Sequence, residues 1–143
     1  MTGDVSPPRL AEEERRAFDK GVAEFNSGYF FECHDTLEEL WGGLRGPSRD
    51  FFQGLIQVSV AFYHLTRGNE AGAESMLSRA LTRFAAYPPR YFGFDLDEHR
   101  ATLTAWLARI RSGGVAEPAL AELPKWRFEA RGAPATEPGK GPQ

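Results

Sequence analysis

The sequence predicts an all-α protein: a compact single-domain bundle of about five helices, built from antiparallel helical hairpins. Apolar residues recur at helical spacing, and no segment shows the period-2 alternation of a strand. Glycines or prolines, singly or in pairs, separate the helical segments. Residues 51–65 contain no charge and carry apolar side chains on nearly every side of a helical wheel. That pattern is typical of a buried helix, so we expect it at the centre of the bundle.

Composition fits one soluble domain. The chain has 143 residues, 41% of them hydrophobic, which is enough for one core. A formal net charge of -3 makes nucleic acid and acidic membranes unlikely partners. The single Cys33 excludes an intramolecular disulfide. The N-terminus lacks the apolar core of a signal peptide, and no segment reaches the roughly 20 apolar residues of a membrane span. We therefore expect a cytoplasmic protein.

Helix boundaries follow from caps and breakers. The first helix is expected to begin near Ser6, where Ser-Pro-Pro precedes three glutamates, and to end before Gly28. The second covers about residues 29–41, and two glycines end it. Ser48 can cap the central helix, which ends near Gly68.

The fourth helix is expected over about residues 70–86, where two prolines stop it. The fifth begins at Asp95-x-x-Glu98, which resembles a capping box, and reaches Arg111. Residues 118–129 are too apolar for a free tail and should dock as an extended C-terminal strap. The domain would then span 6–129, with residues 130–143 as a disordered tail.

A weak internal repeat supports the hairpins. Small and apolar residues of the second helix recur forty residues later in the fourth. The two sets are Gly28, Cys33, Leu37 and Trp41, and Gly68, Ala73, Leu77 and Leu81.

The central helix carries its polar exceptions in one narrow stripe, formed by Gln53, Gln57 and His64 together with Val60. Buried polar groups normally have hydrogen-bonding partners. The stripe therefore predicts a specific internal polar network, whose partners must come from neighbouring helices.

His34 and Glu38 are the expected partners. On a helical wheel His34 lies within the apolar stripe of the second helix, so it should face the core, and Glu38 lies one turn later at the edge. In one interpretation these residues form a satisfied structural network with a glutamine and hold no cofactor. In the other, His34, Glu38 and His64 bind one divalent metal ion. The first is favoured, and no metal is assigned.

Two further features have simpler explanations. Cys33 cannot act with His34, because consecutive helical residues diverge by ~100°, and it should be a small buried hydrophobe. Arg79 and Arg83 lie one turn apart on the outer side of the fourth helix and could form an anion-binding patch. A solvated helix face is the favoured interpretation for them.

Several motifs resemble a known family. They are Phe25-Asn26-x-Gly28-x-Phe30-x-Glu32-x-His34-x-x-Leu37-Glu38-x-x-Trp41, Gly46-Pro47-x-Arg49, Gln53-Gly54-Leu55-Ile56-Gln57 and His64. Over roughly residues 18–107 the chain is similar to the uncharacterised bacterial family catalogued as domain of unknown function 309. The resemblance implies a compact all-α fold and brings no activity, substrate or cofactor. Asp35 departs from the pattern, where Glu is expected, and should face solvent.

The resemblance adds Glu32 and Arg49, which could form a salt bridge, to the candidate polar cluster. That cluster is Glu32, His34, Glu38, Arg49, Gln53, Gln57 and His64. The favoured function is a non-enzymatic interaction or scaffold module whose partner is a protein, with a homodimer as one option. The alternative is a small metal-dependent, hydrolase-like enzyme with His34, Glu38 and His64 as ligands.

Overall fold

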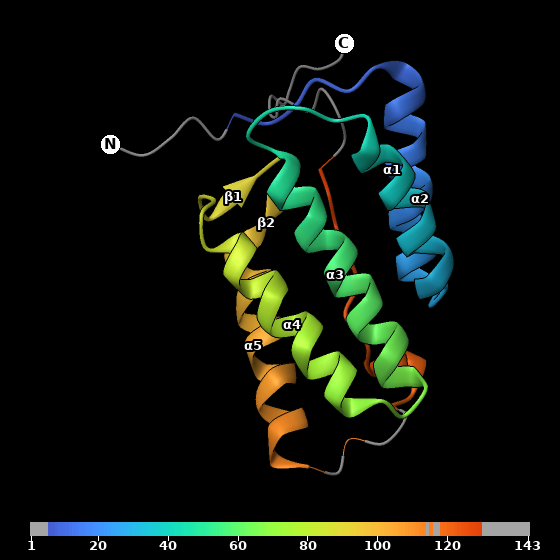
Figure 1. Ribbon diagram of the computed structural model, residues 1–143, viewed down its shortest axis with the longest axis vertical. Coiled ribbons are helices and arrows are strands. Elements are labelled where there is room, and N and C mark those ends of the chain that lie inside the picture. The colour runs from blue at the N-terminus through green and yellow to red at the C-terminus, as the bar shows by residue number, and fades with distance from the viewer. Residues whose placement is uncertain (1–5, 114, 116–117, 130–143) are drawn as a thin grey trace.

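The computed structural model describes residues 6–113, 115 and 118–129, and this part of the chain is helical as predicted (Figure 1). Its α-helices are α1 (Glu12–Asn26), α2 (Phe30–Gly42), α3 (Arg49–Thr66), α4 (Glu70–Phe84) and α5 (Leu96–Ser112). Two short strands, β1 (Arg90–Tyr91) and β2 (Phe94–Asp95), precede α5, and a 3-10 helix covers Leu120–Glu122. The predicted tail, 130–143, lies outside the described residues.

The central helix is α3, with α2 on one side and α4 on the other (Figure 1). α1 packs against α2, and α5 packs against α4. Aromatic side chains from several elements meet around α3, and the fully buried ones include Phe18, Phe25, Phe51, Phe52, Phe62 and Phe84. Residues 118–129 pass behind α3 in the view of Figure 1, and the buried side chains of Leu123 and Trp126 join them to the core. The predicted strap is confirmed.

The two hairpins, α1–α2 and α3–α4, turn in the same way. Gly28 and Gly68 follow the first helix of each hairpin and have φ angles of 85° and 79°. Residues with a Cβ rarely adopt this left-handed conformation, which explains glycine at both positions. Five residues later, Cys33 and Ala73 are both buried, so small side chains lie where the helices pack.

The start of α1 corrects the sequence prediction. The helix begins at Glu12 rather than near Ser6, because the Glu14 carboxylate accepts a hydrogen bond from the Ala11 N–H (2.8 Å) and so closes the first turn there. The residue before a proline is also biased towards extended backbone, which keeps the Ser-Pro-Pro segment out of the helix.

The β-hairpin is an element that the sequence did not predict. Its turn residues Phe92 and Gly93 have φ angles of 55° and 76°, so both are left-handed, as tight two-residue hairpin turns require. β2 also pairs with the strap through a bridge between Phe94 and Phe128, so it lies between β1 and the strap. Strands of two residues are too short to show a period-2 pattern, which is why they were missed.

Among the helices of the described residues, none is long and apolar enough to cross a bilayer.

Candidate functional site

The polar stripe of α3 lies on the side of this helix that its neighbours cover least. Most of α3 is buried, as predicted, but Gln53, Val60 and His64 are partly exposed. Gln57 is the exception, with 9% of its surface exposed. The stripe is therefore a partly open surface between α2 and α4, rather than a wholly internal network.

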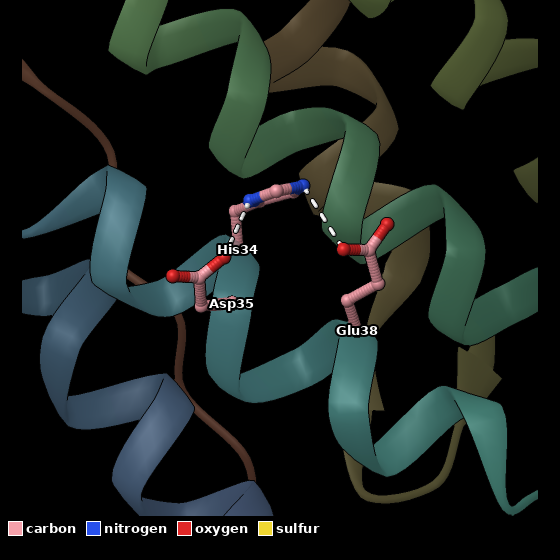
Figure 2. Close-up of side chains that lie close together, drawn as sticks. All are labelled: His34, Asp35 and Glu38. Atoms are coloured by element: carbon pink, nitrogen blue, oxygen red, sulfur yellow. Dashed lines mark ion pairs between the residues drawn. The ribbon is translucent and has the colours of Figure 1, made fainter.

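His34 lies at the rim of the core, with a side chain that is 25% exposed. Its Nε2 is 3.6 Å from Glu38 Oε1, and its Nδ1 is 3.4 Å from Asp35 Oδ1 (Figure 2). His34 is therefore partly buried, and not enclosed in the core as predicted. α2 packs against α1 as well as α3, and its buried residues are Phe30, Cys33, Leu37 and Leu40, which leaves His34 at the edge of the buried stripe.

A divalent metal ion would find ligand atoms here. One atom each from His34, Asp35 and Glu38 lie within 4.8 Å of one another. This group differs from the predicted set, because Asp35 takes part in it and His64 does not. His64 instead has its Nδ1 3.3 Å from the Asn69 side-chain nitrogen, at the turn between α3 and α4. One imidazole and two carboxylates are ligands that zinc, iron and manganese accept.

An apolar pocket adjoins His34 between α2 and α3. Phe31, His34, Val60, Tyr63 and His64 line a volume of about 150 Å³. The two histidines of the predicted cluster therefore share a pocket, although His64 does not join the ligand group. Aromatic residues supply most of the apolar wall of this pocket.

The aromatic residues at this pocket were not predicted from the sequence as part of a site. The rings of Phe31 and Tyr63 lie 5.6 Å apart, from α2 and α3. Phe31 is 50% exposed and the neighbouring Tyr29 is 60% exposed. The pair Phe30-Phe31 was the available signal, since adjacent helical residues cannot both face one core. We call Tyr29, Phe31 and Tyr63 the aromatic face.

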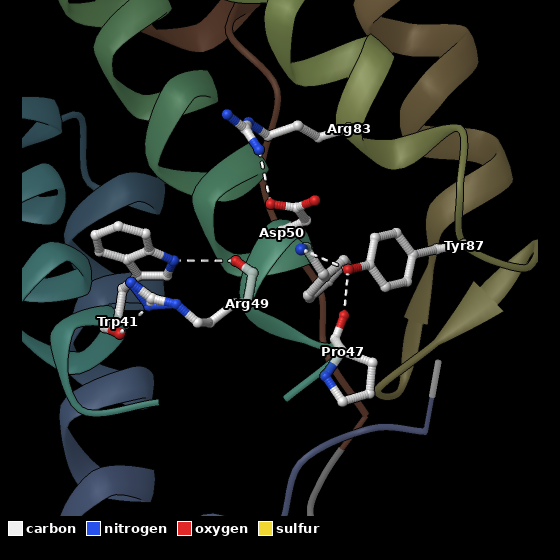
Figure 3. A network of polar contacts seen from close by, with 7 residues as sticks. Trp41, Pro47, Arg49, Asp50, Arg83 and Tyr87 are labelled. Atoms are coloured by element: carbon white, nitrogen blue, oxygen red, sulfur yellow. Dashed lines mark hydrogen bonds and ion pairs between the residues drawn. The ribbon is translucent and has the colours of Figure 1, made fainter. Parts of the chain in front are cut away.

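The predicted salt bridge between Glu32 and Arg49 is not formed. Glu32 is exposed in the first turn of α2, whereas Arg49 lies at its other end, with its guanidinium carbon 3.8 Å from the Trp41 ring centroid. The Trp41 indole N–H also donates to the Arg49 carbonyl oxygen (3.1 Å; Figure 3). In an antiparallel pair the start of one helix meets the end of the other, which separates the two charges.

Gln53 and Gln57 lie in a different hollow from the two histidines. They line a groove of about 600 Å³ between α3 and α4, together with Arg79 and Arg83. Arg83 Nη1 lies 2.7 Å from Asp50 Oδ1 (Figure 3). The predicted cluster is therefore not one site. His34 and His64 line the α2–α3 pocket, with Glu38 beside His34. Gln53 and Gln57 line the α3–α4 groove, Arg49 lies against Trp41, and Glu32 is exposed.

Two buried titratable groups lie outside these surfaces. Burial raises the pKa of the Cys33 thiol to about 12, so it is a protonated, inert core residue, as expected. Burial lowers the pKa of His99 to about 3, so this imidazole is neutral. Its Nε2 is buried without a partner among the described residues. His99 belongs to α5, whereas the predicted cluster residues belong to α2 and α3.

The fold and these surfaces define the chain as an all-α protein of helical hairpins with a partly open polar and aromatic face. Residues 18–76 match the family described as "Domain of unknown function (DUF309)". The family resemblance is thereby confirmed, and the chain carries a DUF309 region. The match ends at residue 76, short of the limit at 107 drawn from the motifs.

Two relatives show further similarity. An "Uncharacterized protein" of Aquifex aeolicus (strain VF5) is 30% identical over 94 residues, which cover 65% of this chain and 28% of that protein. The "Uncharacterized protein YpuF" of Bacillus subtilis (strain 168) is 40% identical over 53 residues, or 36% of this chain and 30% of that protein. The chain therefore spans less than a third of the length of either relative.

Proposed function

We propose that the protein is a non-enzymatic interaction module that binds a partner polypeptide through the aromatic face. The observation that carries this proposal is the exposure of Phe31 (50%), which lines an apolar pocket, with the exposed Tyr29 (60%) two residues earlier in the chain. Large aromatic side chains are enriched in the buried centres of interfaces, where they supply much of the binding energy. A partner side chain that filled the pocket would cover Phe31 and Tyr63 together.

The charges around the aromatic face specify the partner further. α2 contains no Lys or Arg and exposes Glu32, Asp35 and Glu38, whereas its fourth acidic residue, Glu39, lies towards Lys20 of α1. On the other side of the pocket, the Arg67 guanidinium carbon lies 5.3 Å from the Tyr63 ring centroid. A segment with a large apolar residue, and with Lys or Arg on the side facing α2, would complement this surface. A second copy fits less well, because two acidic α2 helices would repel each other.

Peptide selection tests this proposal. A displayed library of random peptides is selected on the wild-type protein, and the recovered peptides are measured against Phe31→Ser. We expect peptides with an apolar residue flanked by Lys or Arg, and about tenfold or greater loss of affinity in the variant. Recovery of acidic peptides, or equal affinity for Phe31→Ser, would contradict the proposal. Phe31 is half exposed and a serine in its place would also be exposed, so the Phe31→Ser variant is expected to fold.

A metal-dependent enzyme is the second candidate, favoured by the proximity of ligand atoms from His34, Asp35 and Glu38. In this case a hydrolase-like reaction would use the adjoining pocket, with His64 beside the substrate rather than on the metal. Elemental analysis of protein purified without chelator tests it. About one zinc, iron or manganese per chain, lost in His34→Ala but not in His64→Ala, would support a metal centre at this group. Absence of metal from the native protein would argue against it.

The proposal includes a cytoplasmic location. The single cysteine, Cys33, is a buried free thiol, which fits a reducing compartment.

A further inference from the structure

We infer that the groove between α3 and α4 is a second binding site, which takes a small molecule through a phosphate or carboxylate group. Six polar residues line this groove: Asp50, Gln53, Gln57, Arg79, Thr82 and Arg83. It lies on the α4 side of α3, whereas the aromatic face lies on the α2 side. The inference is therefore independent of the proposed interaction with a polypeptide.

The side chain of Gln57 supports a ligand site in the groove. This side chain is 9% exposed, and its Oε1 is buried without a hydrogen-bonding partner among the described residues. Buried amide oxygens normally accept a hydrogen bond, so this atom is suited to a donor that enters the groove. Gln53, one turn earlier on α3, adds a second amide to the same wall.

The charges of the groove favour an anion. Arg79 and Arg83 are one turn apart on α4, and both line the groove. Asp50 neutralises Arg83 at 2.7 Å, whereas Arg79 forms no ion pair with any residue in the described part of the chain. A free guanidinium presents a planar set of N–H donors that matches a carboxylate or a phosphate.

Together, the arginine and the glutamine define the class of ligand. The anionic group would bind Arg79, and a hydroxyl or amine beside it would donate to Gln57 Oε1. Phosphate has both features when it carries a proton, and a 2-hydroxy acid has both in one small molecule. A carboxylate without a neighbouring donor would leave the Gln57 oxygen unpaired and should bind more weakly.

Titration followed by ¹H–¹⁵N NMR tests the inference. The 143-residue protein is titrated with sodium phosphate, lactate or acetate, with sodium chloride holding the ionic strength constant. The side-chain amide signal of Gln57 is assigned by its loss in Gln57→Met. We expect this signal to shift saturably with phosphate, with lactate or with both, and to shift less with acetate.

Variants locate the site. Arg79→Ala should weaken binding about tenfold, as expected for loss of a charge-assisted hydrogen bond. Asp50→Asn should tighten it, because Arg83 is then free. Arg16→Ala is the matched control, since it removes the same charge from the exposed surface of α1. Saturation with phosphate alone would assign a phosphorylated ligand, and saturation with lactate alone a hydroxy acid. No saturable shift with either, or equal affinity in Arg79→Ala, would overturn the inference.

Discussion

Asn26 and Trp126 are joined by two hydrogen bonds across a separation of 100 residues. The Asn26 side-chain Nδ2 donates to the Trp126 carbonyl oxygen (2.9 Å), and the Trp126 backbone N–H donates to Asn26 Oδ1 (2.7 Å). The indole of Trp126 also stacks on Phe25, with ring centroids 3.8 Å apart. One side-chain amide thus satisfies both backbone groups of a strap residue, which would otherwise lack partners at the core.

Asn26→Ala should therefore destabilise the protein by about 2–3 kcal/mol, because it removes two hydrogen bonds and leaves partly buried backbone groups unpaired. Urea denaturation monitored by tryptophan fluorescence measures this loss. Ser27→Ala, at the exposed neighbouring position, is the control and should stay within about 0.5 kcal/mol of wild type. Equal stability of the two variants would show that the strap does not depend on the amide.

Two glycine substitutions should have opposite effects. A Cβ at Gly54 in α3 would lie 2.6 Å from Phe84 Cε1, a ring that is fully buried, so Gly54→Ala should cost about 1–3 kcal/mol. A Cβ at Gly42, in the last turn of α2, would meet nothing within 4 Å, so Gly42→Ala should stabilise by up to about 1 kcal/mol. Thermal unfolding of both variants checks the sign. Destabilisation by Gly42→Ala would contradict the open space that surrounds Gly42 in the structure.

The free energy of unfolding should depend on pH because His99 is buried. Burial lowers the pKa of His99 to about 3, whereas the unfolded chain has the ordinary value of about 6.5. Between these values the unfolded state binds more protons, so this contribution to stability is full above about pH 6.5 and falls as the pH is lowered. From pH 7 to pH 5 the loss should be about 2 kcal/mol.

Urea unfolding at both pH values measures this loss in the wild type and in His99→Gln, which cannot take up the proton. The loss should shrink by about 2 kcal/mol in His99→Gln and persist in His34→Gln, because that variant retains the buried His99. An unchanged loss in His99→Gln would assign the acid sensitivity to other groups.

Gln57→Met should not destabilise the protein in the absence of ligand. The buried Gln57 Oε1 has no partner among the described residues, so an apolar side chain of similar shape removes an unfavourable group. We expect the free energy of unfolding to stay unchanged or to rise by about 1 kcal/mol. A loss of 2 kcal/mol or more in urea denaturation would indicate that the amide has a structural partner, such as a bound water.

The starts of α4 and α5 could be predicted from the sequence because the side chains that cap them are local. Asp95 accepts a hydrogen bond from the Glu98 N–H at the start of α5, as the capping-box pattern indicates. The β-hairpin at Phe92 and Gly93 could not, because its left-handed turn and two-residue strands leave no periodic signal. The pairing of Phe94 with Phe128 depends on a strap that folds back over the chain.

The candidate site could be predicted only in part. Helical spacing alone places Glu38 beside His34, and the structure has these side chains 3.6 Å apart. Exposure depends on tertiary packing, so His34 was expected in the core, and Phe31 and Tyr63 were not recognised as surface residues. The separation of Gln57 from the histidine pocket likewise depends on α4. A helical wheel of α3 gives no information about where α4 packs.

Whether the aromatic face binds a polypeptide is tested most directly by one equilibrium measurement. A fluorescent peptide recovered by selection on the wild type is titrated with wild type, Glu32→Lys and Glu13→Lys, and anisotropy gives each Kd. Both substitutions change the net charge equally, but Glu32 is an exposed residue of α2 that directly follows Phe31 in the chain, whereas Glu13 is exposed on α1. We expect the affinity to fall several-fold for Glu32→Lys alone, and more steeply at low salt. Equal affinity for all three proteins would contradict binding at this face.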